Sequence, residues 1–441
     1  MLLGTQRINE AGHLEIGGCD AVTLAHTYGT PLYVMDEPHL RATCRAYREA
    51  LARQYPDSTV AFAGKAFLNL AMCRIAHQEG LSLDIASGGE LFTALHADFP
   101  PARIFFHGNY KTTRELETAL DAGVGRIVVD SVTEMDQLQA VAARKGLMPE
   151  VQVRVAPGVK PQTHTYIQTG QIDSKFGLGI ETGCALEGIR HLATLPNLVF
   201  RGIHCHIGSQ LFGLSSFDVA ARMMADFARE LRETLHLEVA EINMGGGLGV
   251  RYRSSDEPPS IEDYARTLAV ALREECARRS LAQPRLIIEP GRGIVGEAGT
   301  TLYTVGVIKH IPGVRTYVSV DGGMSDNPRP ALYQARYEVI AANKANQAAA
   351  QVVTLAGKHC ECDILISDID LPELEPGDIV AVQTTGAYNY SMASNYNRFT
   401  RPAAVLVGDG RAEVIVERES YEDLIRQDRL PDRLRPSEER R

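Results

Sequence analysis

The sequence predicts an α/β protein in which a parallel (β/α)8 barrel is joined to an all-β domain. From about residue 35, eight short β-rich runs alternate with longer segments whose apolar residues recur at helical spacing. After about residue 293, strand-like runs such as DIVAVQTTGAY and RPAAVLVGDG follow one another, separated by turn signals. At 441 residues, the chain is long enough for one large barrel and a second domain.

Eight strand candidates define the barrel. They are VAFAGKA (60–66), LSLDIAS (81–87), RIFFHGN (103–109), RIVVDS (126–131), VQVRVAPG (151–158), VFRGIHCHIGS (199–209), VAEINMGGG (239–247) and RLIIEPGR (285–292). Helical patterns such as LNLAMCRIAHQEG lie between them, with a glycine near the end. A doubly wound open sheet is the alternative fold, but it more often carries a Gly-rich turn after its first strand, and none follows VAFAGKA.

The same patterns set the predicted domain boundaries. Residues 35–292 are expected to form the barrel, and residues 1–34 and 293–441 the β-domain. The N-terminal runs HLEIGG and PLYVMDE are predicted to add a strand or two to that second domain.

Composition excludes several classes of protein. Lys and Arg number 45 against 55 Asp and Glu, and the net charge of −10 argues against a nucleic acid or an anionic membrane as partner. No segment has the ~18 consecutive apolar residues that a membrane helix needs. The N-terminus lacks the basic and apolar regions of a secretory signal. Eight scattered cysteines without a CxxC pair favour a reduced, cytoplasmic protein.

Polar residues and glycines gather at one end of the predicted barrel. In (β/α)8 barrels the active site lies at the C-terminal ends of the strands. The residues at or just after these ends are Lys65, Asp84, His107, Asn109, Arg154, His206, Ser209, Gly245, Gly246, Gly247, Glu289, Gly291 and Arg292. Because chance would scatter such residues over both ends, we expect an active site at this mouth.

Lys65 is the most unusual of these residues, since it interrupts the apolar run VAFAGKAF. One interpretation is a lysine at the end of a strand, with its stem packed and its ammonium group in water. The other is a lysine enclosed by apolar groups, whose lowered pKa lets the amine form a Schiff base.

The other residues at the mouth narrow this choice. The glycines of NMGGGLG and EPGRG, with the Ser209 hydroxyl, suit a phosphate group because backbone N–H groups can converge on an anion there. His204 and His206 share one face of a strand and are either satisfied core histidines, a metal pair or ligand-binding groups. Glu289 ends an apolar strand and needs a partner, either Arg154 or Arg292 or a protonated ring nitrogen. A lysine, a phosphate site, an imidazole and a buried carboxylate are together the groups needed to hold pyridoxal 5′-phosphate.

At this point the sequence resembles a known family. It is similar to the diaminopimelate decarboxylases, pyridoxal-phosphate enzymes that join a barrel to a β-domain, and more distantly to ornithine and arginine decarboxylases. The motifs run from TPLYVMDE near residue 31 to residue 397: FAGKAF, DIASGGEL, FHGN, YIQTGQIDSKFGLG, HCHIGSQ, NMGGGLG, EPGR, DGGMSDNPRPALY, CECD and GAYNYSMASNYN. The resemblance implies decarboxylation of meso-2,6-diaminopimelate to L-lysine and CO2, the last step of lysine biosynthesis.

The resemblance also implies the residues that hold the cofactor. Lys65 would bind it covalently, His206 would stack on its ring, and Glu289 would pair with its ring nitrogen. Asp84 and Arg154 are assigned to the same binding site, and no metal ion is expected. The phosphate would be held by the residues of the glycine loops and their neighbours: Ser209, Gly245, Gly246, Gly247, Gly291 and Arg292.

Further residues are implied for the substrate. Tyr388 would reach the cofactor phosphate or the substrate. Cys360 and Glu361 would enter the site from the second subunit of a homodimer, the first to supply the proton and the second to bind the distal ammonium. The distal carboxylate would be bound by Arg292, Arg329 and Tyr333, and an arginine fork suits a carboxylate that must be retained.

One feature departs from the family pattern. Family members usually have Ser-Gly between the Cys-Glu pair and the next aspartate, whereas Cys362 stands directly before Asp363 here. The loop is therefore one residue shorter, and either Cys360 or Cys362 is the candidate proton donor. A displacement of about 1 Å at such a group is costly in rate.

Three alternatives have different chemistry. A decarboxylase for ornithine, arginine or carboxynorspermidine shares the cofactor, although Arg329 and Tyr333 favour a substrate with a distal carboxylate. An alanine-racemase-like isomerase tends to set an arginine against the ring nitrogen, so Glu289 favours decarboxylation. A non-enzymatic cofactor-binding barrel would lack the predicted β-domain.

Overall fold

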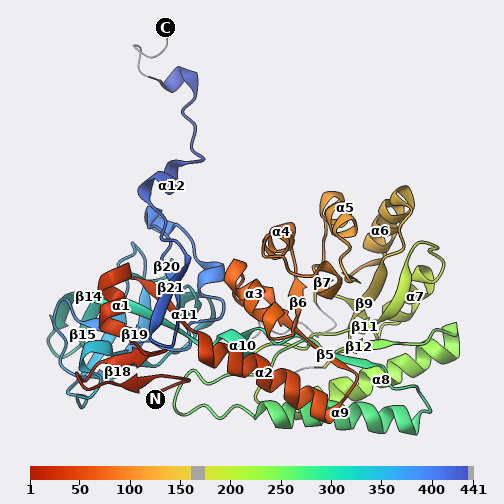
Figure 1. The fold of residues 1–441 in the computed structure, drawn as a ribbon, viewed down its shortest axis with the longest axis horizontal. Helices are drawn as coiled ribbons and strands as arrows, with labels where there is room; N and C mark the ends of the chain where they lie inside the picture. Colours follow the sequence, from red (N-terminus) through yellow and green to blue (C-terminus); the bar gives the residue numbers. More distant parts are fainter. Residues whose placement is uncertain (160–173, 436–441) are drawn as a thin grey trace.

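The computed structural model describes residues 1–159 and 174–435 and confirms the predicted fold class (Figure 1). Residues 166–173 of the YIQTGQIDSKFGLG motif and the C-terminal residues 436–441 lie outside the described part. Eight parallel strands form a closed barrel, because β8 pairs with β9 and β13 pairs with β5. In barrel order they are β5 (Ser58–Ala63), β6 (Ser82–Ile85), β7 (Ile104–Phe106), β8 (Arg126–Val129), β9 (Glu150–Ala156), β11 (Val199–His204), β12 (Glu241–Asn243) and β13 (Arg285–Ile288).

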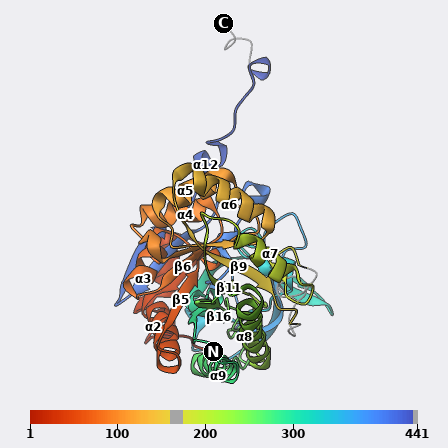
Figure 2. The same cartoon turned by 90° about the vertical axis from the view of Figure 1, so that its right-hand side faces the viewer.

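Helices cover the outside of this barrel, as the end-on view in Figure 2 shows. A short strand, β10 (Leu178–Gly179), adds to β9 before the chain enters the helix that follows it. The helices are α2 (Glu37–Gln54), α3 (Leu70–Gln78), α4 (Gly88–His96), α5 (Thr113–Ala122), α6 (Val132–Lys145), α7 (Cys184–Leu192), α8 (Ser215–Leu235), α9 (Ile261–Arg278) and the short α10 (Arg292–Val295).

The helix ends have local causes in the sequence. Thr112 and Glu115 form a reciprocal capping box at the start of α5. Gly123 and Gly146 end α5 and α6 in the left-handed conformation, with φ of 72° and 64°, which glycine adopts without steric cost. The expected glycine stop signals are thus confirmed at these two helices.

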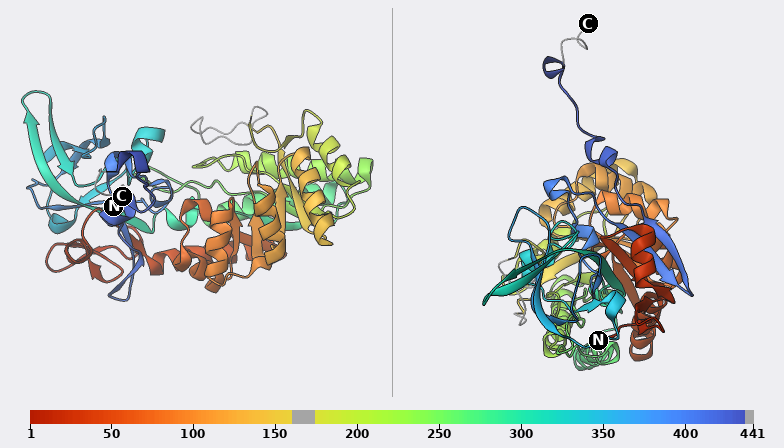
Figure 3. Two further views of the ribbon diagram at one scale, coloured as in Figure 1. Left: turned by 90° about the horizontal axis from the view of Figure 1, so that it is seen from above. Right: turned by 90° about the vertical axis from the view of Figure 1, so that its left-hand side faces the viewer.

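The second domain is a β-sheet that lies beside the barrel, as the two views in Figure 3 show. Its strands run in the order β18-β17-β15-β14-β4-β20-β21, and β19 pairs with both β14 and β16. Their bounds are β4 (Leu32–Asp36), β14 (Gly299–Ile311), β15 (Arg315–Val320), β16 (Val339–Ala341), β17 (Gln351–Ala356), β18 (Ile364–Leu371), β19 (Ile379–Val382), β20 (Ala403–Gly408) and β21 (Arg411–Val416).

The N-terminal segment joins this domain, as predicted. Its strands β1 (Arg7–Ile8), β2 (Leu14–Ile16) and β3 (Cys19–Asp20) form a small sheet of their own before α1 (Ala21–Tyr28). Strand β4 then pairs with β14 and β20. The boundaries at 34/35 and 292/293 stay predictions, and β4 includes residues on both sides of the first.

The two domains meet at the mouth of the barrel. The backbone N–H of Tyr388, from the loop after β19, donates to the carbonyl of Ala66 at 2.9 Å. Tyr390 packs edge-on against Phe67, with ring centroids 5.4 Å apart. These contacts hold a loop of the β-domain over the C-terminal ends of the barrel strands.

Two short helices of the second domain also bear on function. Helix α11 (Arg329–Tyr333) follows β15, whereas α12 (Tyr421–Ile425) lies on the C-terminal segment that extends away from both domains in Figure 1. No helix among the described residues combines the length and the apolar character needed to cross a membrane.

Candidate active site

A cavity of about 420 Å³ lies between the barrel mouth and the β-domain. It is within the size range of about 300–1,000 Å³ that is usual for small-molecule sites. The predicted site residues that line it are Lys65, Asp84, Arg154, His206, Ser209, Gly246, Gly247, Glu289, Gly291, Arg292, Arg329, Tyr333 and Tyr388. The structure therefore brings together residues that lie more than 320 positions apart in the sequence. Three predicted site residues, Gly245, Cys360 and Glu361, do not line the cavity.

Lys65 lies just beyond its strand and not on it. Strand β5 ends at Ala63, and Lys65 is the middle residue of the 3-10 turn Gly64–Ala66. Its neighbours Gly64 and Ala66 are buried, whereas the Lys65 side chain is exposed and lines the cavity. Apolar groups therefore do not enclose the Lys65 side chain, and its role in forming a Schiff base stays a prediction.

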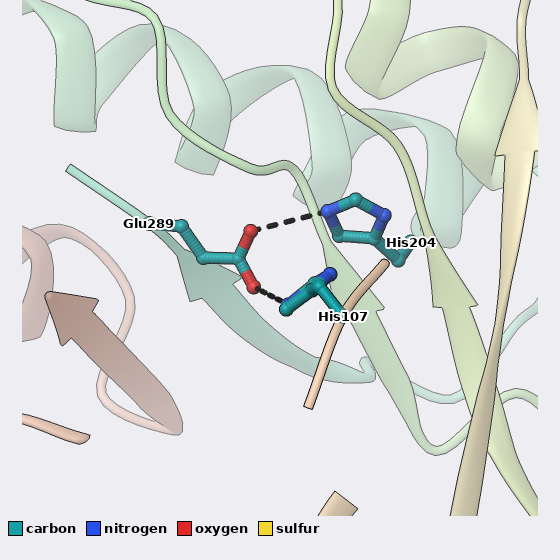
Figure 4. A group of neighbouring side chains, drawn as sticks. All are labelled: His107, His204 and Glu289. Carbon is teal, nitrogen blue, oxygen red and sulfur yellow. Dashed lines mark hydrogen bonds and ion pairs between the residues drawn. The ribbon is translucent and has the colours of Figure 1, made fainter. Parts of the chain in front are cut away.

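Glu289 follows β13 and is contacted by three side chains that lie on other strands or just after them, and Figure 4 shows two of these, His107 and His204. His107 Nε2 and Asn243 Nδ2 contact its Oε1 at 2.8 and 2.6 Å, and His204 Nε2 contacts its Oε2 at 3.1 Å. Of the two alternatives for Glu289, an ion pair with Arg154 or Arg292 is not formed in this structure, and pairing with a protonated ring nitrogen stays a prediction. The strand ends place imidazoles within reach, and the guanidinium groups have other neighbours.

These contacts set the charges in the floor of the cavity. Burial alone would raise the pKa of Glu289, but His107 and His204 hold it well below its usual value. Burial opposes protonation of His107, yet the nearby carboxylates of Asp84 and Glu289 raise its pKa. Burial lowers the pKa of His204 to about 4 in spite of Glu289. Glu289, whose pKa is lowered, thus faces one imidazole with a raised pKa and one with a lowered pKa.

The same three side chains have the donor types of a metal site. The ligand atoms of His107, His204 and Glu289 all lie within 4.8 Å of one another. Hydrogen bonds between them account for this closeness. His206, the other member of the HCH sequence, lines the cavity and is not part of the group. Burial, followed by the charges of Lys65 and Arg154, lowers the pKa of His206 well below its usual value.

The glycine run after β12 is required by close packing. A Cβ on Gly246 would lie 2.2 Å from the carbonyl oxygen of Glu289, and one on Gly247 would lie 2.4 Å from that of Gly208. Gly245 donates its N–H to Asn243 Oδ1 at 3.0 Å. Glycine at these positions therefore lets neighbouring loops meet at the mouth, and their role as phosphate donors stays a prediction.

Arg292 connects the glycine loops with the β-domain side of the cavity. Its guanidinium donates to the Ser209 hydroxyl, with Nη2 at 3.1 Å, and to the Tyr252 hydroxyl. Its Cζ lies 4.8 Å from the centre of the Tyr388 ring. Tyr388 has a φ of 63°, which is uncommon for a residue with a side chain, and its backbone bond to Ala66 fixes it there.

Arg329 faces the same tyrosine from the β-domain. Its Cζ lies 5.5 Å from the Tyr388 ring and 5.0 Å from the Tyr333 ring. Its Nε is buried and has no hydrogen-bond partner among the described residues. No carboxylate of the described residues forms an ion pair with Arg292 or Arg329, so two buried cations lie near one aromatic ring with their charges uncompensated.

Arg154 lies on the opposite side, at the end of β9. Its Cζ is 4.3 Å from the centre of the Phe176 ring, and its Nη1 is 3.9 Å from Asp130 Oδ2. Arg154 and Phe176 both line the cavity.

Cys360 and Glu361 lie on an exposed loop of the β-domain. The backbone N–H of Cys360 donates to Asn397 Oδ1 at 2.9 Å, and Tyr396 donates to Glu361 Oε1 at 3.2 Å. Cys362 is exposed as well, and all eight cysteines of the chain are free thiols.

Sequence reasoning missed the partners of Glu289. His107 and Asn243 were visible as polar residues at strand ends, in FHGN and INMGGG. Asn243 lies on β12, next to β13, but the approach of His107 from β7 needs the closed barrel, which a linear motif does not give.

Comparisons with known proteins agree with this geometry. Residues 38–296 match the family model described as pyridoxal-dependent decarboxylase, pyridoxal binding domain. The diaminopimelate decarboxylase of Bacillus subtilis (strain 168) is 48% identical over 97% of this chain and 98% of its own length, and that of Synechocystis sp. is 47% identical over 98% and 93%. The crystal structure of the M. jannaschii diaminopimelate decarboxylase in complex with L-lysine superposes with a TM-score of 0.92 at 37% identity, covering 99% of this chain and all of the other.

Proposed function

The chain belongs to the diaminopimelate decarboxylases, a family of pyridoxal-dependent decarboxylases, and on that premise we propose that it converts meso-2,6-diaminopimelate to L-lysine and CO2. The relatives that carry this name match nearly the whole length of the chain, so both the barrel and the β-domain are shared with them. The related M. jannaschii enzyme is described with L-lysine bound, which is the product proposed for this chain.

The observation that carries the proposal is the pair of buried arginines at Tyr388. Arg292 and Arg329 have no carboxylate partner within the described chain, although a buried charge normally requires one. A substrate with a second, retained carboxylate would supply it, through the bidentate geometry that arginine favours. Ornithine and arginine carry a cation at that end, which two guanidinium groups would repel.

The cavity also fits pyridoxal 5′-phosphate, which we propose as the cofactor. The Lys65 amine is open to the cavity, and Ser209 with the glycine loops offers a polar rim. A carboxylate has about four acceptor sites, and His107, Asn243 and His204 take three of those of Glu289, so one more N–H can be accepted. When bound, this cofactor supplies a ring that withdraws the electron pair left on the substrate carbon as CO2 departs.

The chain's own residues then have defined tasks. Lys65 holds the cofactor covalently, and Glu289, kept ionised by its histidine partners, favours a proton on the ring nitrogen. His206 stays neutral because its pKa is well below the usual value, so it can lie against an aromatic ring without adding charge. Ser209, the glycine loops and the backbone of Arg292 bind the phosphate, and Asp84, Arg154 and Tyr388 complete the wall.

Cys360 and Glu361 belong to a site in a second copy of the chain under this proposal. Both are exposed and neither lines the cavity of their own chain. We therefore propose a homodimer in which Cys360 delivers the proton to the substrate carbon and Glu361 binds the distal ammonium. Cys362 remains the alternative proton donor. The eight free thiols support a reducing, cytoplasmic location.

Carbon dioxide release tests the proposed substrate. The purified enzyme loaded with pyridoxal 5′-phosphate is offered meso-diaminopimelate, L-ornithine, L-arginine, L-lysine and carboxynorspermidine in parallel. We expect release from meso-diaminopimelate alone, with an equal amount of lysine formed.

Release from ornithine or arginine at a similar rate would overturn the assignment of Arg292 and Arg329 to a distal carboxylate. Racemisation of an amino acid without release would overturn decarboxylation itself.

A further inference from the structure

The loop that carries Cys360 and Glu361 is closed at its base by a buried histidine–aspartate pair. His359 precedes Cys360, and Asp363 follows Cys362. His359 Nδ1 donates to Asp363 Oδ2 at 2.6 Å, and the His359 backbone N–H contacts the same oxygen at 3.3 Å. The three exposed residues 360–362 thus lie between two side chains that are almost completely buried.

Asp363 is fixed by the surrounding backbone as well. Its Oδ1 accepts the N–H of Met324 at 2.8 Å. Gly323 and Gly357 leave room for its carboxylate, since a Cβ on either would lie 2.0 or 1.9 Å from Oδ2. Met324 belongs to the segment that leads into α11 and Arg329. The base of the loop is therefore tied to the segment that presents an arginine to the cavity.

The His359 ring contacts the segment on the other side of the loop. It stacks parallel to the Tyr396 ring, with centroids 6.1 Å apart and planes at 11°, and meets Phe399 edge-on at 4.7 Å. Tyr396 in turn donates to Glu361, and Asn397 accepts from the backbone of Cys360. One ring thus supports both the loop base and the residues that touch the two exposed side chains.

We propose that His359 is a positioning residue that, through Asp363 and Tyr396, sets the place of Cys360 and Glu361 in the shortened loop. This inference rests on the proposed function, which gives those two residues their tasks. A loop with one residue fewer has less freedom to adjust, so its geometry depends on the two residues at its base. A displacement of about 1 Å at a proton donor or a substrate ligand lowers the rate by about 100-fold.

The test compares two substitutions of His359 in the holoenzyme. His359→Phe keeps a ring against Tyr396 and Phe399 but removes the Nδ1 donor. His359→Asn places an amide donor near the position of Nδ1. The matched control is His191→Phe, because His191 and Asp136 form a pair of the same 2.6 Å length on the outer surface of the barrel.

Two properties are measured for each protein. The first is the turnover of meso-diaminopimelate, given as kcat and KM. The second is the alkylation of Cys360 by iodoacetamide, followed by mass spectrometry of its peptide, with the exposed Cys184 on α7 as the internal reference. The alkylation rate reports the position of the loop without depending on turnover.

We expect His359→Phe to lower kcat/KM about 10- to 100-fold and to raise the alkylation rate of Cys360 relative to Cys184 about threefold or more. His359→Asn should have kcat/KM and a Cys360 alkylation rate close to those of the wild type, and His191→Phe should change neither quantity. A His359→Phe enzyme that keeps the wild-type alkylation rate overturns the proposal, whether its activity falls or not.

If His359→Phe does not fold, Asp363→Asn is judged by the same two properties, because it weakens the same pair from the other side. Failure of the proposed function is distinguishable from failure of this inference. A wild-type enzyme that releases CO2 from another substrate contradicts the function, whereas the alkylation comparison still decides the role of His359.

Discussion

The barrel side and the β-domain side of the cavity differ in whether their charged side chains have partners of opposite charge. On the barrel side, the Glu289 carboxylate is matched by His107, His204 and Asn243 within hydrogen-bond distance. On the β-domain side, Arg292 and Arg329 lie near Tyr388 with no carboxylate from the described chain. On the barrel side the Glu289 carboxylate has its partners before any ligand arrives, whereas the two guanidinium groups on the other side have no carboxylate partner among the described residues.

This difference suggests that the barrel side serves the reaction of the cofactor and the β-domain side the choice of substrate. A floor that is already balanced keeps the protonation state of the site fixed, which suits a cofactor that every turnover uses. A cation pair without a partner penalises any substrate that lacks a second carboxylate, because the buried charges then stay unpaired. Substitutions on the two sides are therefore expected to change different kinetic constants.

Lys65→Ala should have the largest effect, since it removes the amine that we propose holds the cofactor on the barrel side. We expect activity to fall about 10⁴-fold or more, and the visible absorbance of the lysine-bound cofactor to disappear. Spectra and CO2 release of the purified variant measure both. Lys145→Ala, at an ion pair on the barrel surface, is the control and should behave as wild type.

The same variant sharpens the assignment of Cys360. Mixing Lys65→Ala with Cys360→Ala subunits should restore activity if each site takes Cys360 from the second subunit. A mixture as inactive as its parts would contradict the shared site, and full turnover by Lys65→Ala alone would contradict the role of the lysine.

Arg329→Gln should have the next largest effect, on the β-domain side. Losing the proposed charge-assisted contact with the distal carboxylate should raise KM for meso-diaminopimelate about 10- to 100-fold and change kcat less. Arg315→Gln is the matched control, because Arg315 also lies over a tyrosine ring, that of Tyr317, but at the half-buried start of β15 and not in the lining of the cavity. An unchanged KM in Arg329→Gln would assign the distal carboxylate to other residues.

On the barrel side, the sequence was enough to predict which residues lie at the mouth, but not which of them contact one another. Strand ends follow from runs such as LIIEP, and in a parallel barrel they must converge, so Lys65, His206 and Glu289 could be placed at one mouth. The partners of Glu289 were harder to predict, because Asn243 lies on the adjacent strand β12 but His107 follows β7, which is separated from β13 by β5 and β6 in the closed barrel.

The β-domain side could be predicted only through the family resemblance. Arg329, Tyr333 and Tyr388 lie outside the barrel, and no periodic pattern indicates that they face it. Their position depends on single backbone contacts such as that between Tyr388 and Ala66, which involves a residue of positive φ. The sequence also did not indicate the base of the Cys360 loop, because the role that we propose for His359 follows from the burial of its side chain.

His107→Gln should have the smallest effect on activity and a distinct effect on pH dependence. The variant keeps a donor to Glu289 but loses the imidazolium charge, so we expect activity to fall about tenfold. The pKa of His107 is raised in the folded protein, so its pairing stabilises the fold below its ordinary pKa of 6.5, and this stabilisation is lost as pH rises through the raised value. The alkaline decline of Tm should therefore be weaker in His107→Gln.

At acid pH, His107→Gln should have the opposite effect on the pH dependence of Tm and make the decline stronger. The low pKa of Glu289 contributes stability above its ordinary value of 4.5, which is lost as pH falls through the folded value. Without the His107 charge, burial raises that folded pKa, so the variant should lose stability and cofactor at a higher pH than wild type. Tm and cofactor absorbance between about pH 3 and pH 9 measure both limbs, with the exposed His310→Gln as control. Identical profiles for His107→Gln and wild type would mean that the balance of charge on the barrel side does not depend on His107.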